Sequence, residues 1–179
     1  MLICFYCFAE SQMNNYGRDF VKPFIFNIWL LNRFQLAPEI IPLLNNRLFR
    51  LESFGDVMST CQELNYIRLM TNNPKTVFGQ WTKNPDIVSR ALDLTGKPEN
   101  MIFIYSNPVV NRLMKLVDIV KRFPYVDKVF NVISEDFAAA HGIKFTCGAR
   151  HCLTCENCYT FGGLTEIIEK LRDAEKTEI

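Results

Sequence analysis

The chain has 179 residues, of which 49% are hydrophobic and 22% are charged, and its formal net charge is +1. This composition excludes an intrinsically disordered protein, and the small net charge gives no overall field toward nucleic acid or a membrane surface. We expect one compact domain, with residues 1–146 as its α/β body. Residues 147–179 would add a cysteine cluster and a C-terminal helix.

The first apolar stretch of the chain, residues 20–31, does not predict a membrane span. Lys22, Pro23 and Asn27 interrupt it, and it is too short to cross a bilayer. We also find no secretory signal pattern. Seven cysteines without an export signal favour metal or redox chemistry in a reducing cytoplasm over a disulfide framework.

Strands and helices alternate from residue 46 onward. Residues 46–53 (NRLFRLES) predict a strand, and Asp56 is expected to cap the helix that follows. The apolar positions of this helix keep a helical spacing and are Val57, Cys61, Leu64 and Ile67. Cys61 is therefore interpreted as a core residue and not as a ligand.

Two further units have the same pattern. Residues 76–82 (TVFGQWT) predict a strand. The next helix is expected over residues 85–94, between Asn84 as its cap and Gly96 as its stop. Residues 101–106 (MIFIYS) form a continuous apolar run, which is typical of a parallel sheet covered on both faces.

The remaining elements are predicted from apolar spacing. A helix that ends near Pro124 is predicted from one apolar face, which comprises Val109, Val110, Leu113, Leu116, Val117 and Val120. Residues 128–134 then predict a strand, residues 135–141 a short helix, and residues 143–146 a last strand. Residues 164–171 keep their apolar side chains on one helical face, which predicts a C-terminal helix.

Four β-α units and a final strand predict an α/β fold with a parallel sheet, either doubly wound or a β/α barrel. In both architectures ligands bind at the carboxyl ends of the strands. The segments expected on this rim are 53–56, 82–83, 106–107 and 134–135. The cysteine run is expected to begin on the same rim.

Four closely spaced cysteines follow the last predicted strand: Cys147, Cys152, Cys155 and Cys158. Their C-x4-C-x2-C-x2-C spacing lets tight turns point successive thiolates at one centre, which predicts a metal site. Two-residue gaps favour an iron–sulfur cluster, with zinc as the alternative because zinc lobes with close runs exist. The density of the run disfavours four unconnected buried thiols. His151 could replace one sulfur, although a solvated histidine is favoured there.

The beginning of the chain carries a second cysteine motif, CFYCFAE, with Cys4 and Cys7. This motif, the β/α series, the ESFGD segment after an early strand and the terminal cysteine cluster together resemble the radical S-adenosylmethionine (SAM) superfamily. More narrowly, the layout is similar to that of small phage-encoded proteins of this kind. The resemblance extends from Cys4 to Tyr159. It implies a partial β/α barrel with a [4Fe-4S] cluster, on which one electron cleaves SAM to an adenosyl radical.

The resemblance also implies particular site residues. Cys4 and Cys7 match the second and third cysteines of the C-x3-C-x2-C cluster loop. The segment that receives the amino group of SAM matches Ser53, Phe54, Gly55 and Asp56. Ser106 matches a position that often contacts the ribose. The first cysteine of the loop, with a strand before it, would precede Met1, and we expect upstream sequence to supply both.

The sequence thus predicts an iron–sulfur protein of the radical-SAM type, with one cluster near the N-terminal cysteines and a second at the C-terminal run. The second cluster would bind substrate, relay electrons or hold the C-terminus folded. The protein would be an enzyme if the N-terminal cluster is complete, with an electron donor and a small-molecule or peptide substrate. The alternatives are a non-enzymatic binding domain with a structural zinc, and a single site shared by both cysteine runs. A cytoplasmic location is expected, in the host if the protein is phage-encoded.

Overall fold

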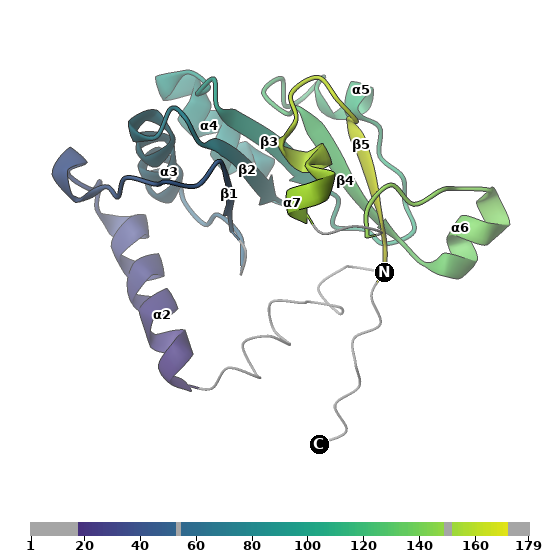
Figure 1. Ribbon diagram of the computed structural model, residues 1–179, viewed down its shortest axis with the longest axis horizontal. Helices are drawn as coiled ribbons and strands as arrows, with labels where there is room; N and C mark the ends of the chain where they lie inside the picture. The colour runs from purple at the N-terminus through teal and green to yellow at the C-terminus, as the bar shows by residue number, and fades with distance from the viewer. Residues whose placement is uncertain (1–17, 53–54, 149–151, 172–179) are drawn as a thin grey trace.

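Five parallel strands form a sheet in the computed structural model, which describes residues 18–52, 55–148 and 152–171 (Figure 1). The strands are β1 (Leu48–Leu51), β2 (Val77–Thr82), β3 (Met101–Ser106), β4 (Lys128–Ile133) and β5 (Glu166–Lys170). They lie in the sheet in the order in which they occur in the chain. All neighbouring pairs are parallel. The prediction of an α/β fold with a parallel sheet is confirmed.

The strand order bears on the doubly wound alternative. A doubly wound sheet reverses its strand order at a switch point. The order β1-β2-β3-β4-β5 contains no reversal among the described strands. The described strands therefore follow one another across the sheet in one direction, and the sheet is open between its edge strands β1 and β5.

Two helices follow their predictions closely. Helix α4 (Pro85–Thr95) begins after Asn84 and ends at Gly96, whose φ of 78° suits glycine. Helix α6 (Glu135–His141) begins after Ser134, whose hydroxyl accepts a hydrogen bond from the Phe137 amide. Local capping signals were sufficient to predict both helices.

Helix α3 (Thr60–Asn72) begins four residues later than the predicted cap. Its N-cap is Ser59, whose Oγ accepts a hydrogen bond from the Gln62 amide at 3.1 Å. The prediction that Asp56 caps this helix is wrong, because its carboxylate bonds to the end of β2 instead. The glutamine at the third helical position then bonds back to the loop, since Gln62 Oε1 accepts from the Met58 amide at 2.9 Å.

The predicted helix over residues 109–120 is wrong except for one turn, α5 (Leu116–Ile119). The preceding loop is held by two buried asparagines, Asn107 after β3 and Asn131 in β4. Asn107 Oδ1 accepts from the Val109 amide at 3.0 Å, and Asn131 bonds to both backbone groups of Met114. These side chains satisfy the backbone in a non-helical conformation, which outweighs the apolar spacing.

The end of the chain also departs from prediction. Residues 143–146 form no strand, and residues 164–171 form a strand instead of a helix, because β5 pairs with β4 through Glu166–Lys170. Thr146 instead supports β5 from its free side, with its amide donating to the Ile168 carbonyl and its hydroxyl accepting from the Ile168 amide. Pairing with the sheet thus overrides the local helical pattern.

Helix α2 (Arg18–Arg33) extends away from the sheet in Figure 1 and packs against α3, and the short helix η2 (Pro38–Ile40) follows it. Asn65 of α3 holds the turn after α2, since its side chain donates to the Leu31 and Phe34 carbonyls and accepts from the Leu36 amide.

Among the helices in the described part of the chain, none is both long and apolar enough to cross a membrane.

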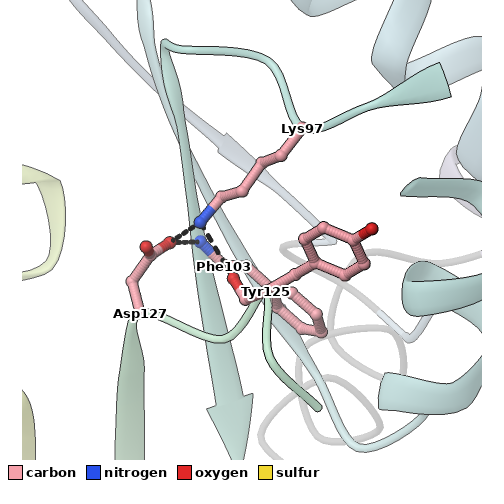
Figure 2. A network of polar contacts seen from close by, with 4 residues as sticks. All are labelled: Lys97, Phe103, Tyr125 and Asp127. Carbon is pink, nitrogen blue, oxygen red and sulfur yellow. Dashed lines mark hydrogen bonds and ion pairs between the residues drawn. The ribbon is translucent and has the colours of Figure 1, made fainter. Parts of the chain in front are cut away.

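The main hydrophobic core lies between the sheet and helices α3 and α4. Its buried members are Leu51, Val57, Ile67, Met70, Phe78, Val88, Ala91, Leu92, Met101, Phe103, Ile119, Phe123, Val126 and Val129. Figure 2 shows a polar contact at its margin, where Asp127 accepts from the Phe103 amide at 2.7 Å and pairs with Lys97. The ammonium group of Lys97 also donates to the Tyr125 carbonyl, so this network joins β3 to the start of β4.

Candidate functional site

The cysteine segment, residues 147–148 and 152–164, lies on the face of the sheet opposite α3 and α4, which we call the inner face. In Figure 1 the helix α7 (Cys152–Cys155) lies in front of the strands and α4 lies behind them. Glu63 of α3 bonds to Gln80, whereas Trp81, which points to the opposite face of β2, contacts Tyr159. The short helix η3 (Asn157–Tyr159) contacts β2 and β3 directly. The segment therefore covers the sheet as the connection that leads into β5.

Each end of the cysteine segment is hydrogen-bonded to the sheet. At its beginning, the Cys147 amide donates to the Ile168 carbonyl of β5 at 3.0 Å. At its end, Lys128 Nζ of β4 donates to the Leu164 carbonyl at 2.7 Å. The prediction that the run begins at the rim agrees with the position of Cys147, which bridges to Glu169 near the end of β5.

Between its ends the segment packs on an aromatic cluster of the inner face. The Tyr159 ring meets the Trp81 ring edge-on, with centroids 5.8 Å apart. The Arg50 guanidinium lies over the same Trp81 ring at 4.5 Å from its centroid, which is a cation–π contact. Trp81 of β2 is thus the platform that positions η3.

Gly79 of β2 leaves the room that this packing requires. A Cβ atom at Gly79 would lie 2.8 Å from Trp81 Cζ3 and 2.9 Å from Tyr159 Cε1, which is closer than side chains tolerate. Glycine is required here because the two aromatic rings approach the backbone closely. Its backbone conformation is not the reason, since its φ is not positive. The glycine in TVFGQWT therefore matters for the seating of the cysteine segment.

The four cysteines of the predicted metal site lie near one another. Burial and, to a smaller extent, the neighbouring Cys147, Cys152 and Cys155 raise the pKa of the Cys158 thiol to about 12, with Lys128 acting in the opposite direction. The structure thus brings together on the inner face the four residues that the C-x4-C-x2-C-x2-C spacing predicts to cooperate. The Cys158 thiol therefore resists ionisation unless a cation compensates the charge of its thiolate.

The thiols are not arranged as a closed coordination shell. No three His, Cys, Asp or Glu side chains in the described ranges form a group that could hold a metal ion. The four cysteines are not joined in disulfides, and Cys152 is exposed while the other three are half-buried. Metal binding would require these sulfurs to move closer together, which would couple metal binding to the ordering of the segment.

A second group of polar side chains lies at the carboxyl ends of β1 and β2. Asp56 accepts hydrogen bonds from the Lys83 amide at 2.8 Å and from the Thr82 hydroxyl. Its Oδ1 also accepts from the Val57 amide at 2.8 Å. Asp56 therefore fixes the loop after β1 to the end of β2, which is a structural role that the sequence did not predict.

Glu52, which directly follows β1, is a rim carboxylate that the sequence analysis missed. Its φ of 54° is unusual for a glutamate, and its Oε1 accepts from Tyr66 Oη at 2.5 Å and Gln62 Nε2 at 2.7 Å. Burial raises the pKa of Glu52, Tyr66 lowers it through its hydrogen bond, and Asp56 raises it. Two carboxylates thus lie close together at the rim that ESFGD was expected to form.

Glu63 of α3 and Gln80 of β2 form a buried pair beneath this rim. Gln80 Nε2 donates to Glu63 Oε2 at 2.5 Å, whereas the buried Oε1 atoms of both residues have no hydrogen-bond partner among the described residues. Burial raises the pKa of Glu63 to about 7, with the Gln80 bond lowering it and Glu52 and Asp56 raising it. A protonated Glu63 can donate to Gln80 Oε1 and satisfy both unpartnered oxygens.

We therefore expect Glu63→Gln to stabilise the protein at pH 8 and to flatten its pH dependence. Below the ordinary pKa of 4.5 the carboxyl group is protonated in both the folded and the unfolded chain. As the pH rises to about 7, only the unfolded chain ionises, so the free energy of unfolding falls by up to roughly 3 kcal/mol. Urea unfolding of both proteins between pH 4.5 and pH 8 measures this fall. The exposed variant Glu99→Gln is the control, and a Glu63→Gln profile equal to the wild type would contradict the assignment.

The other predicted site residues are located as follows. Gly55 lies at the rim with φ 101°, and Ser106 is the half-buried last residue of β3. Four predicted residues, Cys4, Cys7, Ser53 and Phe54, lie outside the described residues. The structure therefore leaves the N-terminal cluster as a prediction.

Lys128 and Gln80 were also missed by sequence analysis. Both are buried side chains in strands that otherwise read as apolar, at the start of KVFNVI and in the middle of VFGQWT. A charged or amide side chain in such a strand needs a polar partner. That was the signal that could have identified these positions.

The chain is thus an α/β protein with a parallel sheet wound in one direction and a four-cysteine segment on its inner face. The model of the protein family described as Gene product 88 matches residues 10–176, and the chain belongs to this family. A search of the curated proteins and a search of the solved structures found no match.

Proposed function

We propose that this protein is an iron–sulfur protein whose four C-terminal cysteines bind a cluster against the inner face of the sheet. The observation that carries the proposal is the proximity of the other three thiols to Cys158, whose pKa Cys147, Cys152 and Cys155 all raise. The donor set fits the group, because thiolate sulfur is the usual ligand of iron–sulfur clusters. The residues that would hold the cluster are Cys147, Cys152, Cys155 and Cys158.

The spacing of the run favours iron–sulfur chemistry over zinc. Its last three cysteines are separated by two residues each, a spacing found in ferredoxin-type cluster loops. A bound [4Fe-4S] cluster would supply one-electron transfer. The chain itself would shield one side of that centre, because η3, which contains Cys158, packs on β2 and β3 and its Tyr159 contacts Trp81. A reducing cytoplasm, that of the host for a phage protein, suits such thiols.

We further propose a partial β/α barrel of the radical-SAM type. The support is the strand order, which runs in one direction as a barrel wall does, and the carboxylates Glu52 and Asp56 at the carboxyl end of the sheet. In this proposal Cys4 and Cys7 hold a first cluster, and the segment from Ser53 to Asp56 with Ser106 receives SAM. To bind SAM, the Asp56 carboxylate would have to break its hydrogen bonds to Thr82 and Lys83 at the end of β2. An electron donor and a small-molecule or peptide substrate would complete the system.

The test of this enzymatic proposal is SAM cleavage. The chain as given and a chain extended by the codons upstream of Met1 would be purified without oxygen, reduced and incubated with SAM. We expect 5′-deoxyadenosine from the extended chain, because three thiolates leave one open iron for SAM whereas two leave two. Cys7→Ala in the extended chain should abolish the product, with Cys61→Ala as the matched control. Full activity of Cys7→Ala, or no product from the extended chain, would reject the radical-SAM proposal.

A structural zinc at the same four cysteines is the second candidate. It is favoured by the position of the segment, since the cysteines lie in the connection that leads into edge strand β5 and a metal would fasten this connection to the sheet. The protein would then act as a binding module without redox chemistry. Zinc in the purified protein without acid-labile sulfide would favour this candidate.

A further inference from the structure

Lys128, the first residue of β4, is an unusual buried cation. Its relative exposure is 1%, and lysines are almost never fully buried unless they are paired. In the described part of the chain no carboxylate lies within ion-pair distance of its ammonium group. The adjacent Asp127 pairs with Lys97 instead, as Figure 2 shows, and Lys128 Nζ donates to the Leu164 carbonyl.

The strand register directs Lys128 toward the cysteine segment. Cross-strand partners in a parallel sheet share a face, and Lys128 pairs with Ile104, which pairs with Trp81. Trp81 contacts Tyr159, the residue that follows Cys158. The short helix η3, which contains Cys158, contacts β3, the strand that lies between Trp81 and Lys128.

A metal bound by four thiolates would need such a cation. Four thiolates around Zn²⁺ or around a [4Fe-4S]²⁺ cluster leave a net charge of −2, which is costly beside an apolar sheet. The face of β3 beside Lys128 is apolar, because Ile102 and Ile104 are fully buried. The hydrogen bond of Lys128 to the Leu164 carbonyl uses one of the three N–H donors of an ammonium group, so two donors could face sulfur.

We propose that Lys128 is the buried counter-charge of the four-cysteine centre, held by the Leu164 carbonyl so that its ammonium group stabilises the metal-bound thiolate of Cys158. This inference rests on the proposed metal centre and gives a residue outside the cysteine run a positioning role. Groups of this kind around a metal site commonly change affinity by about 10–100-fold. For an iron–sulfur cluster, a nearby positive charge also raises the reduction potential.

The first experiment titrates the metal-free full chain with Co²⁺ and follows the thiolate-to-cobalt absorption. Lys128→Met should bind Co²⁺ about 10–100-fold more weakly than the wild type. Lys128→Arg, which keeps the charge, should bind more tightly than Lys128→Met. Lys97→Met is the matched control, because it removes a lysine from the Asp127 ion pair and should leave the Co²⁺ affinity unchanged. If Lys128→Met does not fold, Lys128→Gln replaces it in the same comparison.

The second readout separates electrostatics from a purely structural role. In iron-loaded protein, the midpoint potential of the cluster should become more negative in Lys128→Met and remain close to the wild-type value in Lys97→Met. Equal Co²⁺ affinity and equal potential in Lys128→Met and the wild type would overturn the role of Lys128 and leave the metal centre standing. Absence of Co²⁺ binding by the wild type would instead reject the metal centre itself, and the inference with it.

Discussion

Replacing Cys155 with serine should remove the metal from the C-terminal site and lower the melting temperature by roughly 5–10 °C. Loss of a ligand bound at about 100 times its dissociation constant costs about 2.7 kcal/mol, and 1 kcal/mol shifts the melting temperature of a chain of this size by about 2–4 °C. The segment after Thr146 should become less ordered, because the binding energy of a metal site also stabilises the folded segment that holds the metal. Metal analysis and thermal unfolding of the anaerobically purified variant measure both effects.

Cys61→Ser is the matched control for this experiment. Cys61 is a half-buried cysteine of α3, which lies on the other side of the sheet from the cysteine segment. This variant should keep the full metal content and lose only packing energy. Unchanged metal content and an unchanged melting curve in Cys155→Ser would show that Cys155 is not a ligand.

Gly79→Ala should destabilise the protein by about 1–3 kcal/mol, because the added methyl group overlaps with two aromatic rings. The new Cβ would lie 2.8 Å from Trp81 and 2.9 Å from Tyr159. Trp81 is also packed beneath Arg50, so we expect Tyr159 and the adjacent Cys158 to move. Urea unfolding should show the lost stability, and Co²⁺ titration should show weaker metal binding.

Two further variants test the reason for this effect. Gly163→Ala is the control, since its added Cβ would meet nothing closer than 3.5 Å and its φ is not positive. Tyr159→Leu combined with Gly79→Ala should recover part of the stability lost in Gly79→Ala, which a double-mutant cycle measures. Wild-type stability and metal affinity in Gly79→Ala would contradict the seating of η3 on β2.

The elements that were predictable from sequence carry their signals locally. The strands β2, β3 and β4 are apolar runs, and α4 and α6 have start and stop residues at the expected places. The elements that were predicted wrongly depend on distant residues. Asn131 of β4 holds the loop before α5 in a non-helical conformation, and β5 is a strand because the edge of β4 is available to it. Such contacts leave no local pattern.

In the candidate site, too, features with a local sequence signal were predictable and features that depend on distant residues were not. The spacing of the four cysteines was enough to predict that they lie near one another, since the gaps are too short to separate them. The role of Asp56 was not predictable, because its partners Thr82 and Lys83 come from the next strand. Lys128 and Glu63 were missed because their burial depends on how β4 and α3 pack.

The proposed function requires the four cysteines on the inner face to bind an iron–sulfur cluster. The most direct test is the iron, zinc and acid-labile sulfide content of the chain, purified without oxygen from iron-supplied cells. We expect a brown protein with iron and sulfide in equal amounts, and loss of both in a variant with Cys147, Cys152, Cys155 and Cys158 all changed to serine. Stoichiometric zinc without sulfide, or iron and sulfide retained in that variant, would contradict it.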